Sequence, residues 1–231
     1  MLRLAIPAVT IKLPGSGRLY GALAIAGLLA ASQMAGAQRA GTQGPPRFPT
    51  LTMEQLDETQ RNVAERVMKV SSAGLGGPYA MLLRSPKLLE RYLGMTDYLR
   101  FETSMPKHLN EMAILMQARL WDAQYEWWAH YPIALKAGLR KEVADAIRDG
   151  RKPADMAPEE QVVWDVVTEL LTERVLSDDT FQRARQTLGE QQIIDLVAVA
   201  GFYVMVSTVI HAGRVAVPNG DPLPLPTLIK K

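Results

Sequence analysis

The sequence predicts an all-α protein with one folded domain over residues 51–215. Three observations support this fold class. Apolar residues recur at helical spacing through nearly the whole range, and alternating runs of β-branched residues are absent from it. Prolines and glycines mark the ends of the periodic segments, where helices are expected to begin and end.

The first helix is expected at about 53–73, directly after the proline-rich start of the chain. Gln55 follows Thr52 by three residues, which is the spacing of a capping box at a helix start. The stretch 71–86 holds three glycines and two prolines and is expected to interrupt the helical pattern.

The later helices also begin and end at recognisable residues. Gly138 is expected to end one helix, Pro158 occupies a first helical position, and Ser177 or Asp178 caps the helix that follows. These helices are expected over about 86–100, 107–122, 123–138, 140–150, 159–175, 179–187 and 190–211.

The last of these helices is unusually apolar. Its 18-residue stretch IIDLVAVAGFYVMVSTVI is interrupted only by the charged Asp195. The length suggests a membrane span, but amphipathic helices surround it, so we expect a core or subunit-interface helix and no stable span in the mature chain. The apolar surface exceeds what a small domain needs to bury, which predicts a homo-oligomer. Residues 216–231 are proline-rich and are expected to run extended over the surface.

Residues 1–37 predict a signal peptide. They contain three basic residues, no acidic residue, an apolar run at 22–31 and a small-residue cleavage site ending at Ala37. Cleavage near Ala37 would leave a linker, 38–50, that is rich in proline and glycine. The chain is therefore expected to be exported, periplasmic or secreted; the alternative is an uncleaved N-terminal membrane anchor.

Composition excludes several functional classes. Without residues 1–37 the formal net charge falls from +2 to −1, so no basic excess suggests a nucleic-acid partner. The chain has no cysteine, which excludes disulfides and thiolate nucleophiles. It has three histidines without zinc-site spacing and no glycine-rich phosphate-binding motif, so we expect no metal and no cofactor.

The candidate catalytic residues are Glu111, Glu126 and His130. Glu126 and His130 are four residues apart on one helix and point with apolar residues, as Glu111 does on the preceding helix. Ionisable groups in an apolar pocket suit general acid–base chemistry. The alternative is structural: a buried Glu126–His130 ion pair, with Glu111 paired to an arginine such as Arg119 or Arg100.

Two further residues are weaker candidates for substrate binding. Trp127 lies next to Glu126. Trp127 and the adjacent Trp128 cannot both face inward, because successive helical residues are about 100° apart, so we expect one in a pocket or the core and the other at the surface or an interface. Tyr203 on the last helix carries a hydroxyl that could reach a pocket, although we favour the alternative, ordinary hydrogen bonding inside a helix interface.

The spacing of Glu111, His130 and Gly138 within 101–139 resembles the carboxymuconolactone decarboxylase and alkylhydroperoxidase D family. The pattern of that family has a glutamate, a CxxC motif twelve residues later, a histidine four residues further and a glycine eight beyond. The resemblance implies an alkylhydroperoxidase D-like helical bundle. The cysteine positions fall on Ala123 and Glu126, so this chain would belong to a cysteine-free, decarboxylase-like branch.

The resemblance implies cofactor-independent acid–base chemistry without thiol peroxidase activity. We expect a lyase, decarboxylase or isomerase acting on a small lactone or keto acid. His130 would donate or remove a proton at carbon, Glu126 would hold its tautomer and charge, and Glu111 would act as a second acid or base. The alternative is a non-catalytic scaffold or binding protein that retains the fold. A pocket of roughly 300 Å³ or more at these residues would favour a ligand site, and a filled interface the scaffold.

Overall fold

The computed structural model describes residues 44–71 and 73–228, and these residues form helices and no strand. The predicted all-α fold class is confirmed. The predicted signal peptide, the cleavage site near Ala37 and residues 38–43 of the predicted linker lie outside the described residues. The α-helices are α2 (Glu58–Val70), α3 (Pro78–Leu82), α4 (Pro86–Asp97), α5 (Lys107–Leu120), α6 (Gln124–Lys136), α7 (Lys141–Arg148), α8 (Pro158–Thr168), α9 (Asp178–Thr187) and α10 (Gly189–Gly213).

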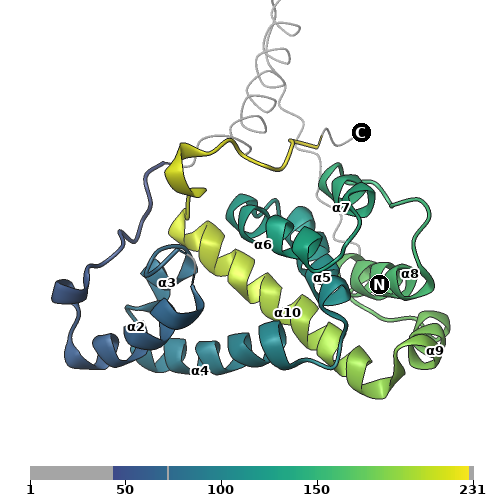
Figure 1. Ribbon diagram of the computed structural model, residues 1–231, viewed down its shortest axis with the longest axis horizontal. Helices are drawn as coiled ribbons and strands as arrows, with labels where there is room; N and C mark the ends of the chain where they lie inside the picture. Colours follow the sequence, from purple (N-terminus) through teal and green to yellow (C-terminus); the bar gives the residue numbers. More distant parts are fainter. Residues whose placement is uncertain (1–43, 72, 229–231) are drawn as a thin grey trace, which may run out of the picture. The chain divides into compact units, whose positions relative to one another are not determined.

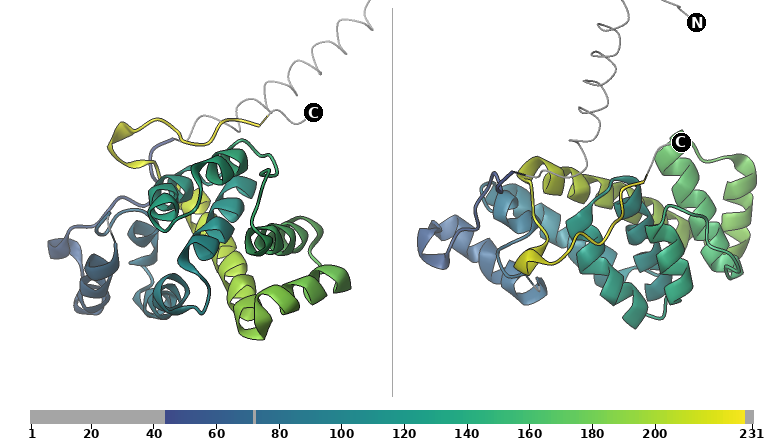
Figure 2. Two further views of the ribbon diagram at one scale, coloured as in Figure 1. Left: turned by 45° about the vertical axis from the view of Figure 1, so that its right-hand side comes forward. Right: turned by 90° about the horizontal axis from the view of Figure 1, so that it is seen from above.

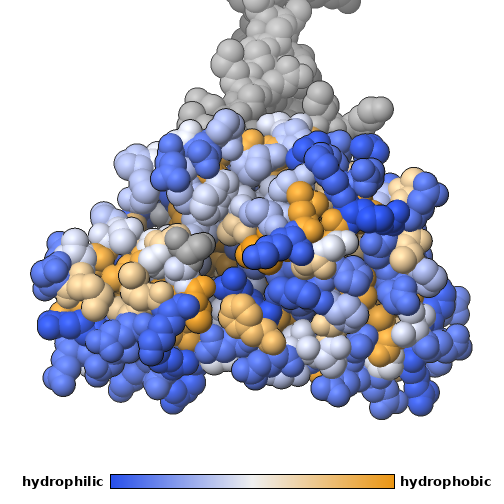
Figure 3. Space-filling view, in the orientation of Figure 1, coloured by the Kyte–Doolittle hydropathy of each residue, from blue (hydrophilic) through white to orange (hydrophobic). Residues whose placement is uncertain are grey.

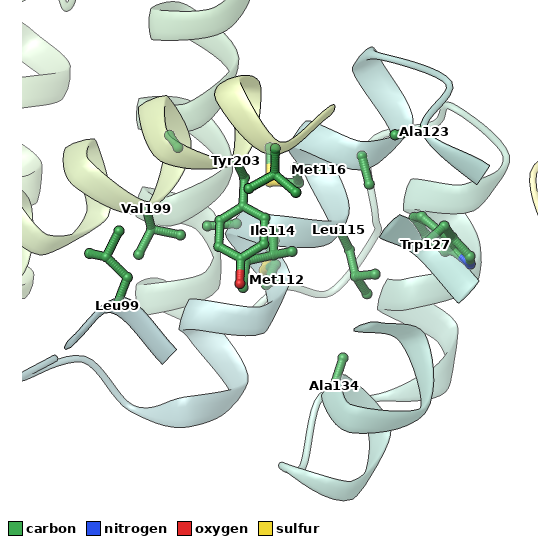
Figure 4. Close-up of a cluster of buried hydrophobic side chains, with 14 of the residues drawn as sticks. Leu99, Met112, Ile114, Leu115, Met116, Ala123, Trp127, Ala134, Val199 and Tyr203 are labelled. Carbon is green, nitrogen blue, oxygen red and sulfur yellow. The ribbon is translucent and has the colours of Figure 1, made fainter. Parts of the chain in front are cut away.

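The helices surround α5, which packs against α6, α7, α8 and α10 (Figure 1). Eleven residues of α5 are buried, so this helix is enclosed on nearly all sides. Figure 4 shows Met112, Ile114 and Leu115 of α5 in the core beside Val199 and Tyr203 of α10. The core is therefore built where the two helices that carry the candidate residues, α5 and α6, meet α10.

The first predicted helix begins later than expected. Thr52 and Gln55 do form the capping interaction, but it opens only the 3₁₀ turn η2 (Met53–Gln55). A second capping box starts α2: Asp57 accepts from the Gln60 backbone N–H at 2.8 Å, and the Gln60 side chain accepts from the Asp57 N–H at 3.0 Å. Two similar caps lie five residues apart, and the second one begins the longer helix.

The predicted interruption at 71–86 contains a helix that periodicity does not reveal. The five-residue α3 begins at Pro78, whose fixed φ suits a first helical position. Gly77 precedes it with φ +62°, a conformation that favours glycine. Elsewhere the predicted signals hold, since α8 begins at Pro158 and Ser177 caps α9 by accepting from a backbone N–H.

Two helices end in π-helical turns. α4 continues into η3 (Tyr98–Glu102), and α8 continues into η4 (Glu169–Glu173). A π-turn inserts an extra residue, which changes the direction of every side chain that follows it, and such turns are frequent at functional sites. η3 carries Arg100, which lies close to the candidate residues.

Most of α10 is packed against the domain. Among the described residues it is the one helix long and apolar enough to cross a membrane by length and composition, yet 56% of its most apolar window is buried. Its exposed face still holds apolar side chains, including Ile194 with 67% exposure and Met205 with 37%. On the face of the domain shown in Figure 3, apolar residues lie in separate patches among polar ones. The homo-oligomer stays a prediction.

The C-terminal segment is held more firmly than an extended surface tail. It includes the short turn η5 (Pro218–Gly220) and then crosses the start of α6 (Figure 2). The Gln124 side chain donates to the Leu225 carbonyl at 3.1 Å and accepts from its N–H at 2.8 Å. Leu225 is buried and Arg119 donates to the Pro226 carbonyl at 2.9 Å, so the segment covers the end of α5 and the beginning of α6.

Candidate active site

The structure brings Glu111, Glu126 and His130 together. α5 and α6 are joined by a short turn and pack side by side, so residues nineteen apart in the sequence meet. His130 Nδ1 lies 2.7 Å from Glu111 Oε2, and His130 Nε2 lies 3.2 Å from Glu126 Oε1. All three side chains are buried. One imidazole is thus held at both nitrogens by carboxylates from two helices.

The partner of Glu111 is a lysine instead of the arginine that the structural alternative considered. Lys107 Nζ lies 2.7 Å from Glu111 Oε1, one helical turn away on α5. Arg119 instead pairs with Asp122 and binds backbone carbonyls. The i,i+4 spacing of Lys107 and Glu111 was readable from the sequence and is the signal that could have predicted this pair.

The charges of this network shift the pKa of two of its members. Burial alone would raise the pKa of Glu111, but the His130 imidazolium and the Lys107 ammonium outweigh it and lower this pKa to about 2. Burial alone would lower the pKa of His130, but the Glu111 and Glu126 carboxylates raise it to about 9. His130 is therefore a protonated imidazolium at neutral pH, and Glu111 is its ionised counter-ion.

A cavity of about 70 Å³, open to solvent on one side, adjoins His130 and Glu126. Glu111 does not line it and lies behind the imidazole. The volume is well below the roughly 300 Å³ typical of a drug-sized ligand. The helix interface is thus not completely filled, but the space suits only a very small molecule or one end of a larger one.

Four tyrosines line the same cavity: Tyr79, Tyr92, Tyr125 and Tyr203. Burial, and the nearby Glu126 carboxylate after it, raise the pKa of the hydroxyl of Tyr92 and of Tyr203. None of these four tyrosine hydroxyls forms a hydrogen bond with another described residue. Neutral hydroxyl donors therefore surround the Glu126 carboxylate and remain available to a bound molecule.

Of the two weaker candidates for substrate binding, Tyr203 lines the cavity and Trp127 does not. Tyr203 lines the cavity, and its ring meets that of His130 edge to face at 5.2 Å. Trp127 does not line the cavity: it is 1% exposed and stacks on Tyr131, and its contact with a substrate stays a prediction. The side chain points into the core beside α5, where Figure 4 shows it apart from Tyr203.

The sequence did not point to the other tyrosines of the cavity, and it suggested Arg100 only as a possible partner of Glu111. Tyr79 lies in the unpredicted α3, and Tyr125 packs its hydroxyl against Gly77 so closely that a Cβ there would lie 2.2 Å from it. Both depend on tertiary contacts with no local signal. Among the described residues, no group of three acidic, histidine or cysteine side chains is placed to hold a metal ion.

Comparison with known proteins identifies the fold. No family profile matches the sequence, and no curated protein matches it. A solved structure described as the alkylhydroperoxidase AhpD core, an uncharacterized peroxidase-related protein from Ralstonia eutropha JMP134, is similar with a TM-score of 0.65. It has 16% identity, over 76% of this chain and 94% of that one. An uncharacterized peroxidase-related protein from Silicibacter sp. TM1040 has a TM-score of 0.62 and 15% identity, over 75% and 92% of the two chains.

The chain has the alkylhydroperoxidase D fold. At this level of identity the likeness concerns the fold alone. In this chain, the positions that the sequence pattern assigns to the two cysteines are Ala123, which is buried at the start of α6, and Glu126 in the cavity wall.

Proposed function

We propose that the protein is a cofactor-independent acid–base lyase, decarboxylase or isomerase that acts on a small keto or lactone acid. The observation that supports it is the His130 imidazolium, held between two carboxylates at the wall of a cavity with available hydroxyl groups. A buried imidazolium bordering a cavity supplies a proton in a site of low water content. The absence of cysteine excludes the thiol route to peroxide reduction.

The geometry favours a division of roles that differs from the sequence-based one. Glu111, fully buried behind the imidazole and 2.7 Å from Nδ1, holds the orientation and charge of His130. Glu126, which lines the cavity, is the carboxylate able to remove a proton from a bound molecule. His130 is the acid, because its raised pKa keeps it protonated at neutral pH.

Decarboxylation illustrates how these groups would act. In a β-keto acid, the bond from the α-carbon to the carboxylate breaks, CO₂ leaves, and the electron pair remains as an enolate of the neighbouring carbonyl. The proton of His130 Nε2 moves to that carbon, and His130 regains a proton from solvent through the open side of the cavity. In an isomerisation, Glu126 would remove one proton from carbon and His130 would return one at another position. Tyrosine hydroxyls would stabilise the enolate oxygen.

The test is a screen of the purified full-length protein against two- to six-carbon keto acids, β-keto acids and lactone acids. Release of CO₂ reports decarboxylation, and incorporation of deuterium from D₂O at carbon, followed by NMR, reports proton transfer without decarboxylation. For a compound that responds, we expect His130→Gln and Glu126→Gln each to lower the rate by roughly 100-fold or more, as for loss of an acid–base group.

Glu160→Gln is the matched control. Glu160 is also a buried glutamate, paired with Arg140 at 2.8 Å, and it lies outside the cavity. Its variant should keep the wild-type rate. Equal rates in wild type and both site variants would overturn the proposal, and so would a complete lack of turnover across the panel, which would favour a non-catalytic scaffold or binding protein.

A further inference from the structure

The Arg100 guanidinium has few partners although it lines the cavity. One 3.4 Å contact, from Nη1 to the Val70 carbonyl, is the only hydrogen bond it makes with the described residues. Its Nε is buried without a partner there. Its carbon Cζ lies 4.9 Å from the centroid of the Phe101 ring, which supports the cation from one side. A guanidinium has five N–H donors, so most of its capacity remains unused.

Several other arginines of the domain lie beside carboxylates. Arg140 lies 2.8 Å from Glu160, and Arg148 lies 3.2 Å from Asp145. No carboxylate of the described residues forms such a pair with Arg100. A buried donor without a partner costs free energy unless a ligand or water satisfies it. Arg100 combines a buried Nε without a partner, no carboxylate pair among the described residues and a place in the cavity wall.

The π-turn η3 explains how Arg100 reaches this position. It lies at the end of α4, where the extra residue of the π-turn redirects the chain before α5 begins. Lys107 donates to the Arg100 carbonyl at 2.7 Å and so ties this turn to the first turn of α5. The same lysine pairs with Glu111, so the turn and the His130 network share one anchor.

The charges around the cavity leave one positive charge in excess. Arg100, His130 and Lys107 are three cations, and Glu111 and Glu126 are two carboxylates. Lys107 and Glu111 compensate each other behind the imidazole, which leaves Arg100, the His130 imidazolium and Glu126 at the cavity itself. A ligand with a single negative charge would neutralise this set.

We propose that Arg100 binds the carboxylate of a small monocarboxylate in this cavity. The planar guanidinium matches a carboxylate in a two-bond arrangement, which gives direction as well as charge. The volume of about 70 Å³ fits a carboxylate and only a few further heavy atoms, so the ligand is of the size of acetate or pyruvate or presents such an end. Its identity as a substrate rests on the proposed function, whereas binding itself does not require turnover.

The experiment measures binding of sodium pyruvate and sodium acetate to the resting full-length protein, by ligand-observed NMR and thermal shift at fixed ionic strength. Acetamide serves as the neutral analogue of acetate. We expect saturable binding of the two anions, at least tenfold weaker binding of acetamide, and at least tenfold weaker binding of the anions to Arg100→Gln. Arg100→Lys, which keeps the charge without the two-bond geometry, should lie between the wild type and Arg100→Gln.

Arg66→Gln is the control for a lost positive charge nearby. Arg66 pairs with Asp97 at the surface and does not line the cavity, so its variant should bind pyruvate as the wild type does. Equal affinity for acetate and acetamide, unchanged binding by Arg100→Gln and Arg100→Lys, or no saturation by either anion would overturn the inference. Binding that depends on Arg100 in a protein without turnover would sustain this inference and refute the proposed function alone.

Discussion

Asp195 and Glu126 are carboxylates with the same 3% exposure and very different surroundings. Asp195 on α10 accepts three hydrogen bonds at 2.8 Å: two from the N–H and hydroxyl of Ser104, and one from the Tyr98 hydroxyl. Glu126 on α6 has one contact with a described residue, at 3.2 Å from His130, and borders a cavity. The two carboxylates are thus equally buried, but Asp195 accepts three hydrogen bonds whereas Glu126 has a single polar contact.

The difference separates a structural carboxylate from one that can act on a ligand. Asp195 closes the turn before α5, because its bonds join η3 and that turn to α10. Three of its about four acceptor positions are occupied, which leaves little capacity for another molecule. Glu126 keeps acceptor capacity toward the cavity. Glu111 is fully buried between Lys107 and His130, and it is the counter-ion that stabilises the His130 imidazolium beside Glu126.

The largest expected effect on stability is that of Glu111→Gln. The change leaves Lys107 and the His130 imidazolium without their shared counter-ion, and breaking a buried ion pair costs about 3–5 kcal/mol. Because the imidazole can lose its proton and Lys107 is 40% exposed, we expect about 3 kcal/mol. Urea unfolding at pH 6 measures the free energy of unfolding, and a change below about 1 kcal/mol would contradict the role of Glu111.

The free energy of unfolding should depend on pH through the ion pair of His130 and Glu111. The pKa of His130 is raised from 6.5 to about 9, so its contribution is fully present below pH 6.5 and is lost as pH rises through 9. The pKa of Glu111 is lowered from 4.5 to about 2, so its contribution is present above pH 4.5 and is lost as pH falls toward 2. This pair therefore stabilises the wild type most between pH 4.5 and 6.5, and both dependences should weaken in Glu111→Gln.

Asp195→Asn should have the second largest effect. The amide keeps one oxygen acceptor but places an NH₂ group against donors, so at least one of the three hydrogen bonds is lost. Loss of hydrogen bonds to a charged group predicts a cost of about 1.5–3 kcal/mol in the free energy of unfolding. Binding of pyruvate should be unchanged. Weaker pyruvate binding at equal stability would remove the distinction between the two carboxylates.

Glu126→Gln should have the smallest effect on stability. Its single 3.2 Å contact is long for a charged pair, and removing a poorly compensated buried charge is nearly neutral. We expect a change within about 1 kcal/mol in either direction, together with the loss of turnover described above. If Glu126→Gln lowered the free energy of unfolding as much as Asp195→Asn, Glu126 would also be a structural carboxylate, and the proposed difference between the two residues would be wrong.

Much of the fold was predictable because its signals are local. Helical periodicity, Pro158 at the first position of α8 and the Ser177 cap depend on neighbours within a few residues, so the sequence reveals them. The first helix was placed too early because two capping boxes follow each other, and local rules do not rank them. The short α3 escaped because five residues are too few to show a helical period.

In the candidate site too, contacts within one helix could be predicted from the sequence, and contacts that depend on helix packing could not. Glu126 and His130 share one helix, so their contact follows from i,i+4 spacing. The position of Trp127 could not be assigned, because which neighbour of Glu126 faces the core depends on how α6 is rotated against α5. The Lys107–Glu111 pair had a local signal in its spacing, but arginines farther along the chain were equally possible partners before the fold was known.

The amino-acid sequence by itself determined the helical class, the absence of thiol chemistry and the three ionisable residues on apolar helix faces, because periodicity and composition need no neighbours. Only the tertiary structure decided that Glu111 lies behind His130, that Glu126 faces the cavity and that Arg100 reaches it from a π-turn. These arrangements depend on how helices distant in sequence pack together, and charge compensation in a buried site is fixed by that packing.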